Sequence, residues 1–165
     1  MEIWLLSFLG GLVGSVLMDV TETKLAKLGI SSGVTGAYIG RWIRGLTQGV
    51  LIHQNIAETS PVKNEVRIGQ VFHFIVGGGV VALFYPLALE VAGFADTSNH
   101  LILATLFGLI TSVLPWLVLM PSFGWGMFGS KAPKGAKPVL SPVLSHLSYG
   151  VGIGLTLVAY YAIMS

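Results

Sequence analysis

Four long apolar stretches constrain this chain of 165 residues more than any other feature. They cover about residues 3–20, 71–92, 101–120 and 143–164. A bilayer core about 30 Å thick needs roughly 20 apolar residues in a helix, so each stretch is long enough to cross it. Because backbone in lipid must satisfy its own hydrogen bonds, we expect four transmembrane helices. The predicted fold is an all-α, polytopic membrane protein with a single membrane domain over residues 1–165.

The composition agrees with this interpretation and excludes several classes of protein. Only 10% of the residues are charged, against about 25% in a typical soluble domain. The absence of cysteine excludes disulfides, thiolate metal sites and thiol nucleophiles. A formal net charge of +2 is too small to indicate a nucleic-acid partner. The start, Met1-Glu2-Ile3-Trp4, has no basic segment, so we expect the first apolar stretch to remain as a helix.

The basic residues predict the orientation in the membrane. Six of the nine lie between the first and second stretches and three lie between the third and fourth. They are Lys24, Lys27, Arg41, Arg44, Lys63 and Arg67, followed by Lys131, Lys134 and Lys137. The positive-inside rule places both segments in the cytoplasm. The two chain ends and the loop 93–100 are therefore expected on the opposite side.

The first basic segment is too long to be plain coil. Apolar residues recur within it at steps of three and four, and basic residues take the opposite face. The apolar series is Ile39, Ile43, Leu46, Val50, His53 and Ala57. This pattern predicts an amphipathic helix over about residues 36–58, lying at the cytoplasmic surface of the membrane.

Short sequence matches suggest an internal repeat. Gly11-Leu-Val-Gly-Ser15-Val-Leu17 resembles Gly108-Leu-Ile-Thr-Ser112-Val-Leu114, and the pattern His-x-x-x-Gly-x-Gly begins at His73 and again at His146. We interpret the four helices as two paired-helix repeats related by an axis along the membrane normal. The two histidines would then be symmetry mates at equal depth.

Ionisable residues gather at the predicted cytoplasmic boundary. The candidate site residues are His53, Glu65, His73, His146, Asp19 and Glu22. Histidine with carboxylate is a ligand set for zinc or iron, and two facing histidines suit haem, for which His73 and His146 are the candidate ligands. The same groups suit acid–base chemistry, or pair with one another to hold helices in register. His100 and Asp96, in the outer loop, are expected to be solvated.

Three functional hypotheses stay open at this point. The first is a membrane metalloprotein or haem protein, with zinc, iron or haem as the cofactor. The second is a small carrier for ions, protons or solutes that works as a homo-oligomer; it ranks below the first because four helices are few for a transporter acting alone. The third is an accessory subunit without chemistry. Membrane lipid is the expected partner in each, and no pattern decides whether the protein is an enzyme.

An ordered set of short motifs resembles a known family. The motifs are Met18-Asp19, Gly40-Arg41-Trp42, His53, Pro61 with Glu65, His73, Pro121-x-x-Gly124-x-Gly126, and His146 with Tyr149-Gly150. The chain is similar over nearly its whole length to bacterial membrane proteins grouped as domain of unknown function 2938. The resemblance implies the bacterial inner membrane, with both chain ends periplasmic once the orientation is added. It implies no activity, substrate or cofactor.

Overall fold

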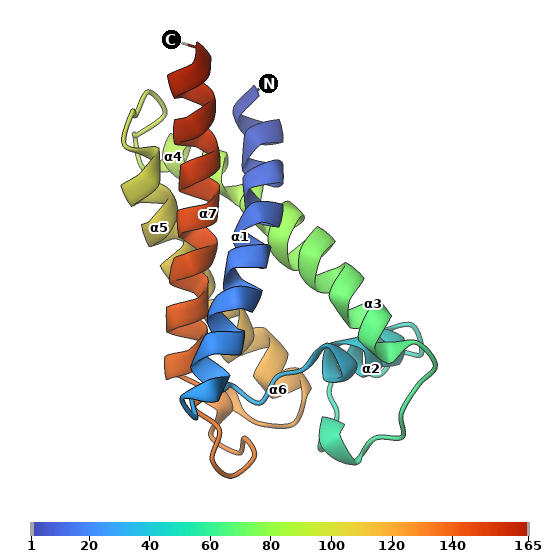
Figure 1. The fold of residues 1–165 in the computed structure, drawn as a ribbon. Coiled ribbons are helices and arrows are strands. Elements are labelled where there is room, and N and C mark those ends of the chain that lie inside the picture. Colours follow the sequence, from blue (N-terminus) through green and yellow to red (C-terminus); the bar gives the residue numbers. More distant parts are fainter. Residues whose placement is uncertain (1, 165) are drawn as a thin grey trace. The chain divides into compact units, whose positions relative to one another are not determined.

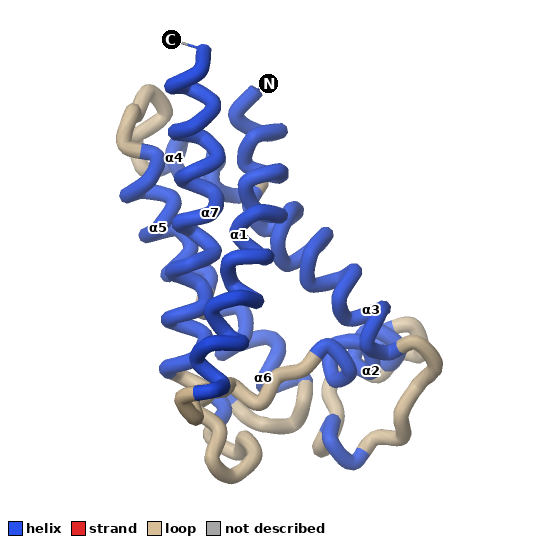
Figure 2. The backbone as a smooth tube through the Cα atoms, in the orientation of Figure 1, coloured by secondary structure: helices blue, strands red, loops and turns tan. Residues whose placement is uncertain are grey.

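The computed structural model describes residues 2–164, which form helices and loops without a strand (Figures 1 and 2). In chain order, the longer helices are α1 (Glu2–Lys27), α2 (Gly36–Leu46), α3 (Glu65–Val71), η2 (Phe72–Val80), α4 (Phe84–Val91), α5 (His100–Thr111) and α7 (Leu140–Met164). Short elements between them are η1 (Ile56–Glu58), η3 (Pro115–Leu119), α6 (Met120–Ser122) and η4 (Met127–Gly129). The all-α class is confirmed for this part of the chain.

Four helical segments in this range are long and apolar enough to cross a membrane: Glu2–Lys27, Glu65–Val91, His100–Ser122 and Leu140–Met164. The shortest has 23 residues, which at about 1.5 Å per residue exceeds a core of about 30 Å. Each overlaps one predicted stretch. The first extends further, to Lys27, and the second begins earlier, at Glu65, because polar residues continue these helices beyond their apolar parts.

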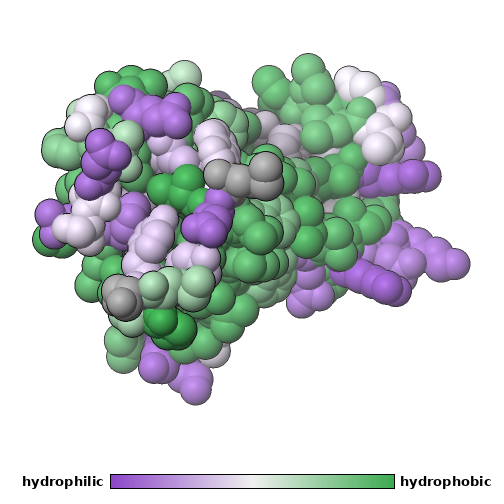
Figure 3. All heavy atoms as spheres, turned by 90° about the horizontal axis from the view of Figure 1, so that it is seen from above, coloured by the Kyte–Doolittle hydropathy of each residue, from purple (hydrophilic) through white to green (hydrophobic). Residues whose placement is uncertain are grey.

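Helix α1 exposes its large apolar side chains and buries its small and weakly polar ones, as expected of a helix in lipid. Its buried face carries small or weakly polar residues, including Ser7, Gly14 and Ser15. Its exposed face carries large apolar side chains, among them Leu5 and Val16, which are 61% and 52% exposed. Seen from the end where the chain termini lie, hydrophobic side chains make up much of the visible surface (Figure 3). A water-facing helix would place these groups the other way round.

The two middle spans are interrupted helices. The second passes from α3 through the π-helical η2 to α4, and the third passes from α5 through the π-helical η3 to α6. Pro115 opens η3, where a residue without an N–H cannot complete the α-helical ladder. Three consecutive glycines from Gly77 lie in η2. Interruptions of this kind in membrane helices often mark functional positions.

The helix predicted over about residues 36–58 is shorter than expected. It is α2, and it ends at Leu46 instead of continuing to residue 58. Gly49 adopts φ +80°, and the Val50 N–H bonds back to the Gly45 carbonyl at 2.9 Å, which turns the chain out of the helix. Residues 50–55 are not helical, the short 3-10 helix η1 follows them, and the His53 N–H bonds to the Ser122 carbonyl at 2.8 Å. Val50, His53 and Ala57 therefore do not share a helix face with Ile39.

The described residues group into two compact units. Unit 1 comprises the chain up to Thr21, Phe74–Thr111 and the chain from Leu144 onward. Its core includes Tyr85, Phe107 and Tyr149. Unit 2 comprises Glu22–His73 and Ser112–Val143. Its core is built from Ile39, Ile56, Met120, Phe123 and Trp125.

Glycine allows the helices of unit 1 to pack closely. A Cβ atom added to Gly108 of α5 would lie 2.5 Å from the His146 carbonyl oxygen and 2.6 Å from the Gly150 nitrogen of α7. One added to Gly11 of α1 would collide with the Gly78 carbonyl of η2. Such contacts let helices associate through backbone packing and dispersion when lipid supplies no hydrophobic drive.

Candidate functional site

A histidine and a threonine meet inside unit 1. The Thr111 hydroxyl of α5 donates to the Gly108 carbonyl at 2.6 Å and also lies 2.8 Å from Nδ1 of His146 on α7. When the Thr111 proton points to the carbonyl, the hydroxyl accepts from an Nδ1–H of His146, and when the hydroxyl turns to the ring it donates to an unprotonated Nδ1. Thr111 can therefore accompany His146 in either protonation state.

More polar groups extend from this pair along the inside of unit 1. The Tyr149 hydroxyl, one turn along α7 from His146, donates to the Gly78 carbonyl of η2 at 2.6 Å. Ser15 of α1 is buried, and its hydroxyl would contact a Cβ added at Gly78. The hydroxyls of Thr21 and Ser148 bond at 2.8 Å. Three helices and η2 thus each contribute polar atoms to the packing of unit 1.

A second histidine lies at the other end of α5. The expectation that His100 is solvated was wrong, because its side chain is only 5% exposed. Its Nδ1 lies 3.1 Å from the Tyr85 hydroxyl, and its ring stacks on Tyr161 with centroids 5.4 Å apart. The sequence pattern placed His100 in a loop, whereas it is the first residue of a helix packed against α4 and α7 residues. Asp96 is exposed, as expected.

Helix α1 contributes a buried hydroxyl that has no partner in the described part of the chain. The Ser7 side chain is fully buried, and its oxygen makes no hydrogen bond there. Buried hydroxyls of this kind are usually satisfied by an ordered water. Ser7 lies eight residues before Ser15 on the same helix, so both face the interior of unit 1.

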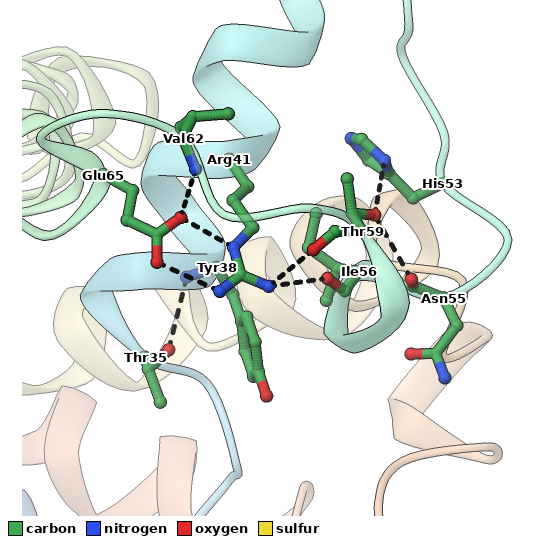
Figure 4. A network of polar contacts seen from close by, with 9 residues as sticks. All are labelled: Thr35, Tyr38, Arg41, His53, Asn55, Ile56, Thr59, Val62 and Glu65. Carbon is green, nitrogen blue, oxygen red and sulfur yellow. Dashed lines mark hydrogen bonds and ion pairs between the residues drawn. The ribbon is translucent and has the colours of Figure 1, made fainter.

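Unit 2 contains a different polar site, an ion pair between α2 and α3 (Figure 4). The Arg41 guanidinium donates to both carboxylate oxygens of Glu65, from Nε at 2.7 Å and from Nη2 at 3.0 Å. Its Nη1 donates to the Thr59 carbonyl at 2.9 Å, and the Val62 N–H donates to Glu65 at 2.9 Å. The guanidinium also lies over the Tyr38 ring, 5.4 Å from its centroid. The hydrogen bond to Glu65 raises the pKa of Arg41 above its ordinary value.

His53 lies next to this ion pair in unit 2 (Figure 4). Its Nδ1 makes a long contact of 3.4 Å with the Thr59 hydroxyl, which in turn donates to the Asn55 carbonyl at 3.3 Å. Its Nε2 is buried and has no partner among the described residues. The main-chain bond to Ser122 fixes the position of the residue.

The predicted site residues fall in both units. Asp19 and His146 belong to unit 1, whereas Glu22, His53, Glu65 and His73 belong to unit 2. Residues 2–164 contain no group of three or more His, Cys, Asp or Glu side chains arranged to hold a metal ion. Glu65 does not suit a metal, because Arg41 and the Val62 N–H already occupy its carboxylate. A ligand shared by His73 and His146 stays a prediction, as does the internal repeat.

The polar partners of the histidines were missed by reasoning from the sequence. Thr111 and Tyr85 lie in apolar stretches, and no polar role was predicted for them. Tyr149 stands in the family motif with His146, but its bond to the Gly78 carbonyl was not predicted. Arg41 was read as part of a basic helix face, although it stands in the family motif Gly40-Arg41-Trp42 beside Glu65 in the motif with Pro61. The distance between these motifs in the chain gave no sign of the ion pair.

Comparison with protein families identifies this chain as a relative of proteins without an assigned role. Residues 8–160 match the family described as "Protein of unknown function (DUF2938)". The chain belongs to this family, which confirms the resemblance drawn from its motifs. Comparisons with curated proteins and with solved structures found no match.

Proposed function

We propose that this member of the family is a small membrane carrier that passes protons, with His146 as the residue that takes up and releases them. The chain has four helices of transmembrane length and composition among its described residues. An ionisable side chain inside such a segment is costly to bury and is a functional candidate for that reason. Among the groups predicted at the cytoplasmic boundary, His146 has the surroundings that best fit this role.

The observation that carries the proposal is the series of proton-bearing groups in unit 1. The Thr111–His146 pair and the His100–Tyr85 pair mark the two ends of α5. Eleven residues separate Thr111 from His100, which is about 16 Å along a helix. Tyr149, Ser15 and Ser7 are also buried in unit 1 and carry hydroxyl groups.

The contact between His146 and Thr111 supports uptake of a proton. The Thr111 hydroxyl lies 2.8 Å from Nδ1 of His146, so an imidazolium formed there has a hydrogen-bond acceptor in place. The interrupted helices are a second support. Membrane carriers commonly bind their ions where a helix is broken and its carbonyls are freed, and the Gly78 carbonyl lies within η2.

Proton flux in reconstituted vesicles tests the proposal. Purified protein in liposomes with an internal pH-sensitive dye should acidify the lumen when a potassium gradient with valinomycin makes the interior negative. His146→Gln should reduce this rate at least about tenfold, within the contribution of a positioned acid–base group. Thr111→Ser keeps the hydroxyl and should retain the flux, and Asp96→Asn in the exposed outer loop is the matched ionisable control. A rate no greater than that of empty liposomes, or full flux in His146→Gln, would reject the proposal.

A haem or metal site with His73 and His146 is the second candidate. The contact between Nδ1 of His146 and the Thr111 hydroxyl favours it, because histidine ligands usually donate a hydrogen bond from the nitrogen that does not bind the metal. An absorption spectrum and elemental analysis of gently purified protein distinguish a haem or metal site from a proton carrier. A Soret band, or one equivalent of metal lost in His146→Gln, supports the ligand role.

A further inference from the structure

Two lysine-bearing segments of unit 2 lie beside each other. The Lys137 N–H bonds to the Ser31 carbonyl at 2.6 Å, and a Cβ added to Gly33 would lie 3.6 Å from Ala136. This pairing joins the loop that follows α1 to the loop that precedes α7. Lys131, Lys134 and Lys137 stand in the second of these loops, and Lys24 and Lys27 stand on the last turn of α1, just before the first loop. We call these five residues the lysine patch.

The charge of the lysine patch is not balanced within the described part of unit 2. All five side chains are exposed, and no hydrogen bond or ion pair there involves their ammonium groups. Unit 2 contains all nine basic residues of the chain and three acidic ones, for a formal charge of +6. Of the acidic residues, Glu65 is held by Arg41, and Glu58 accepts from Asn55 at 2.7 Å. Glu22, on the last turns of α1, is the carboxylate nearest in sequence.

Large apolar side chains adjoin these lysines along the chain and are exposed. Leu28 is 75% exposed, and Val139 and Leu140 are 48% and 45% exposed. Leu28 directly follows the last residue of α1, and Leu140 is the first residue of α7, so both adjoin segments of transmembrane length. Ammonium groups suit a phosphate, and the neighbouring apolar groups suit the acyl region beneath it.

We infer that the lysine patch binds the phosphate groups of anionic phospholipid headgroups, with Leu28, Val139 and Leu140 entering the adjoining acyl region. A soluble phosphate would use the lysines and gain nothing from the apolar side chains. The inference stands apart from the proton carriage proposed for unit 1. A lysine near an anionic membrane surface contributes about 1 kcal/mol, roughly a fivefold change in affinity. Loss of three lysines should then weaken binding on the order of 100-fold.

Titration of the purified full-length protein with lipid tests the inference. The midpoint of thermal unfolding is followed in detergent while phosphatidylglycerol, or phosphatidylcholine with the same acyl chains, is added. Ligand that binds only the folded state raises this midpoint. Wild-type protein should be stabilised by phosphatidylglycerol and not by phosphatidylcholine. The triple variant Lys131→Gln, Lys134→Gln, Lys137→Gln should need on the order of 100 times more of the anionic lipid for the same shift.

A matched control distinguishes binding at the lysine patch from a general effect of the protein's positive charge. The triple variant Arg44→Gln, Lys63→Gln, Arg67→Gln removes the same charge from exposed positions elsewhere in unit 2 and should titrate nearly as wild type. If the first triple variant does not fold, the pair Lys24→Gln, Lys27→Gln tests the other half of the patch and should weaken binding at least tenfold. Equal weakening in the control, equal stabilisation by phosphatidylcholine, or full stabilisation by soluble glycerol 3-phosphate would overturn the inference.

Discussion

At the scale of single residues, the Arg41–Glu65 pair shows how unit 2 uses a charge. The two side chains are only 11% and 15% exposed, so both have lost most of their hydration. The loss is offset because the guanidinium has acceptors at Glu65 and Thr59, and the carboxylate has a further donor at Val62. A desolvated charge is stabilised only while its partner is present.

Removal of one partner should therefore cost more than removal of both charges. Arg41→Met leaves the Glu65 carboxylate with the Val62 N–H alone and should lower the free energy of unfolding by roughly 2–3 kcal/mol. The double variant with Glu65→Gln should recover part of this loss, because no unpaired charge remains. Chemical unfolding in detergent measures both values. Arg44→Met, an exposed position on the same helix, should change stability by less than about 0.5 kcal/mol. A double variant less stable than Arg41→Met would contradict this account.

At the scale of elements, the spans could be predicted because hydrophobic length is a local property of the sequence. The residue at which α2 ends could not be predicted in this way. The apolar period continued by coincidence through Val50, His53 and Ala57, while the bonds from His53 and Ile56 to residues 122 and 123 determine the path of this segment. Such long-range pairing leaves no periodic trace. The π-helical geometry of η2 was also unforeseen, although Gly77-Gly78-Gly79 marked the position.

The suggested repeat can be compared with the glycine contacts of unit 1 without being settled by them. Gly11 and Gly108, which the repeat aligns, both lie at close helix contacts. Their partners differ in register. Gly108 meets Gly150, whereas Gly11 meets Gly78, one residue beyond the position that aligns with Gly150. The repeat therefore stays a prediction.

Two glycines of α2, Gly40 and Gly36, allow a test of how closely α2 packs against α3. A Cβ added to Gly40 would collide with the Glu65 carbonyl, so Gly40→Ala should force the helices apart. We expect a loss of about 1–3 kcal/mol, as for other overpacked contacts. A Cβ added to Gly36 would lie 3.5 Å from the Val66 carbonyl, an ordinary contact, so Gly36→Ala should be neutral within a few tenths of a kcal/mol. Thermal unfolding in detergent compares the two, and equal effects would show that the crossing is looser than described.

At the scale of the whole molecule, charge is the property that the sequence showed most completely. Its nine basic residues all belong to unit 2, whereas unit 1 has none. The candidate site was harder to predict from the sequence. Thr111 and His146 are 35 positions apart and come together only when α5 packs on α7. The positions of charged residues can be read directly from the sequence. A hydrogen bond between two apolar segments depends on how their helices pack, which the sequence pattern does not show.

The orientation in the membrane is the last prediction, and the chain is well suited to testing it. Because it contains no cysteine, single-cysteine variants can be made without a prior background change. Ser98 and Ser130 are both exposed, and they lie in the loop before α5 and in the loop before α7. The positive-inside rule places the lysine-free loop outside the cytoplasm and the lysine-rich loop inside. In intact bacterial spheroplasts, Ser98→Cys should react with a membrane-impermeant thiol reagent and Ser130→Cys should be protected. After the membrane is permeabilised both should react, which shows that protection reflects the membrane and not burial. Reaction of Ser130→Cys in intact cells, with Ser98→Cys protected, would invert the topology and place the lysine patch on the outer face.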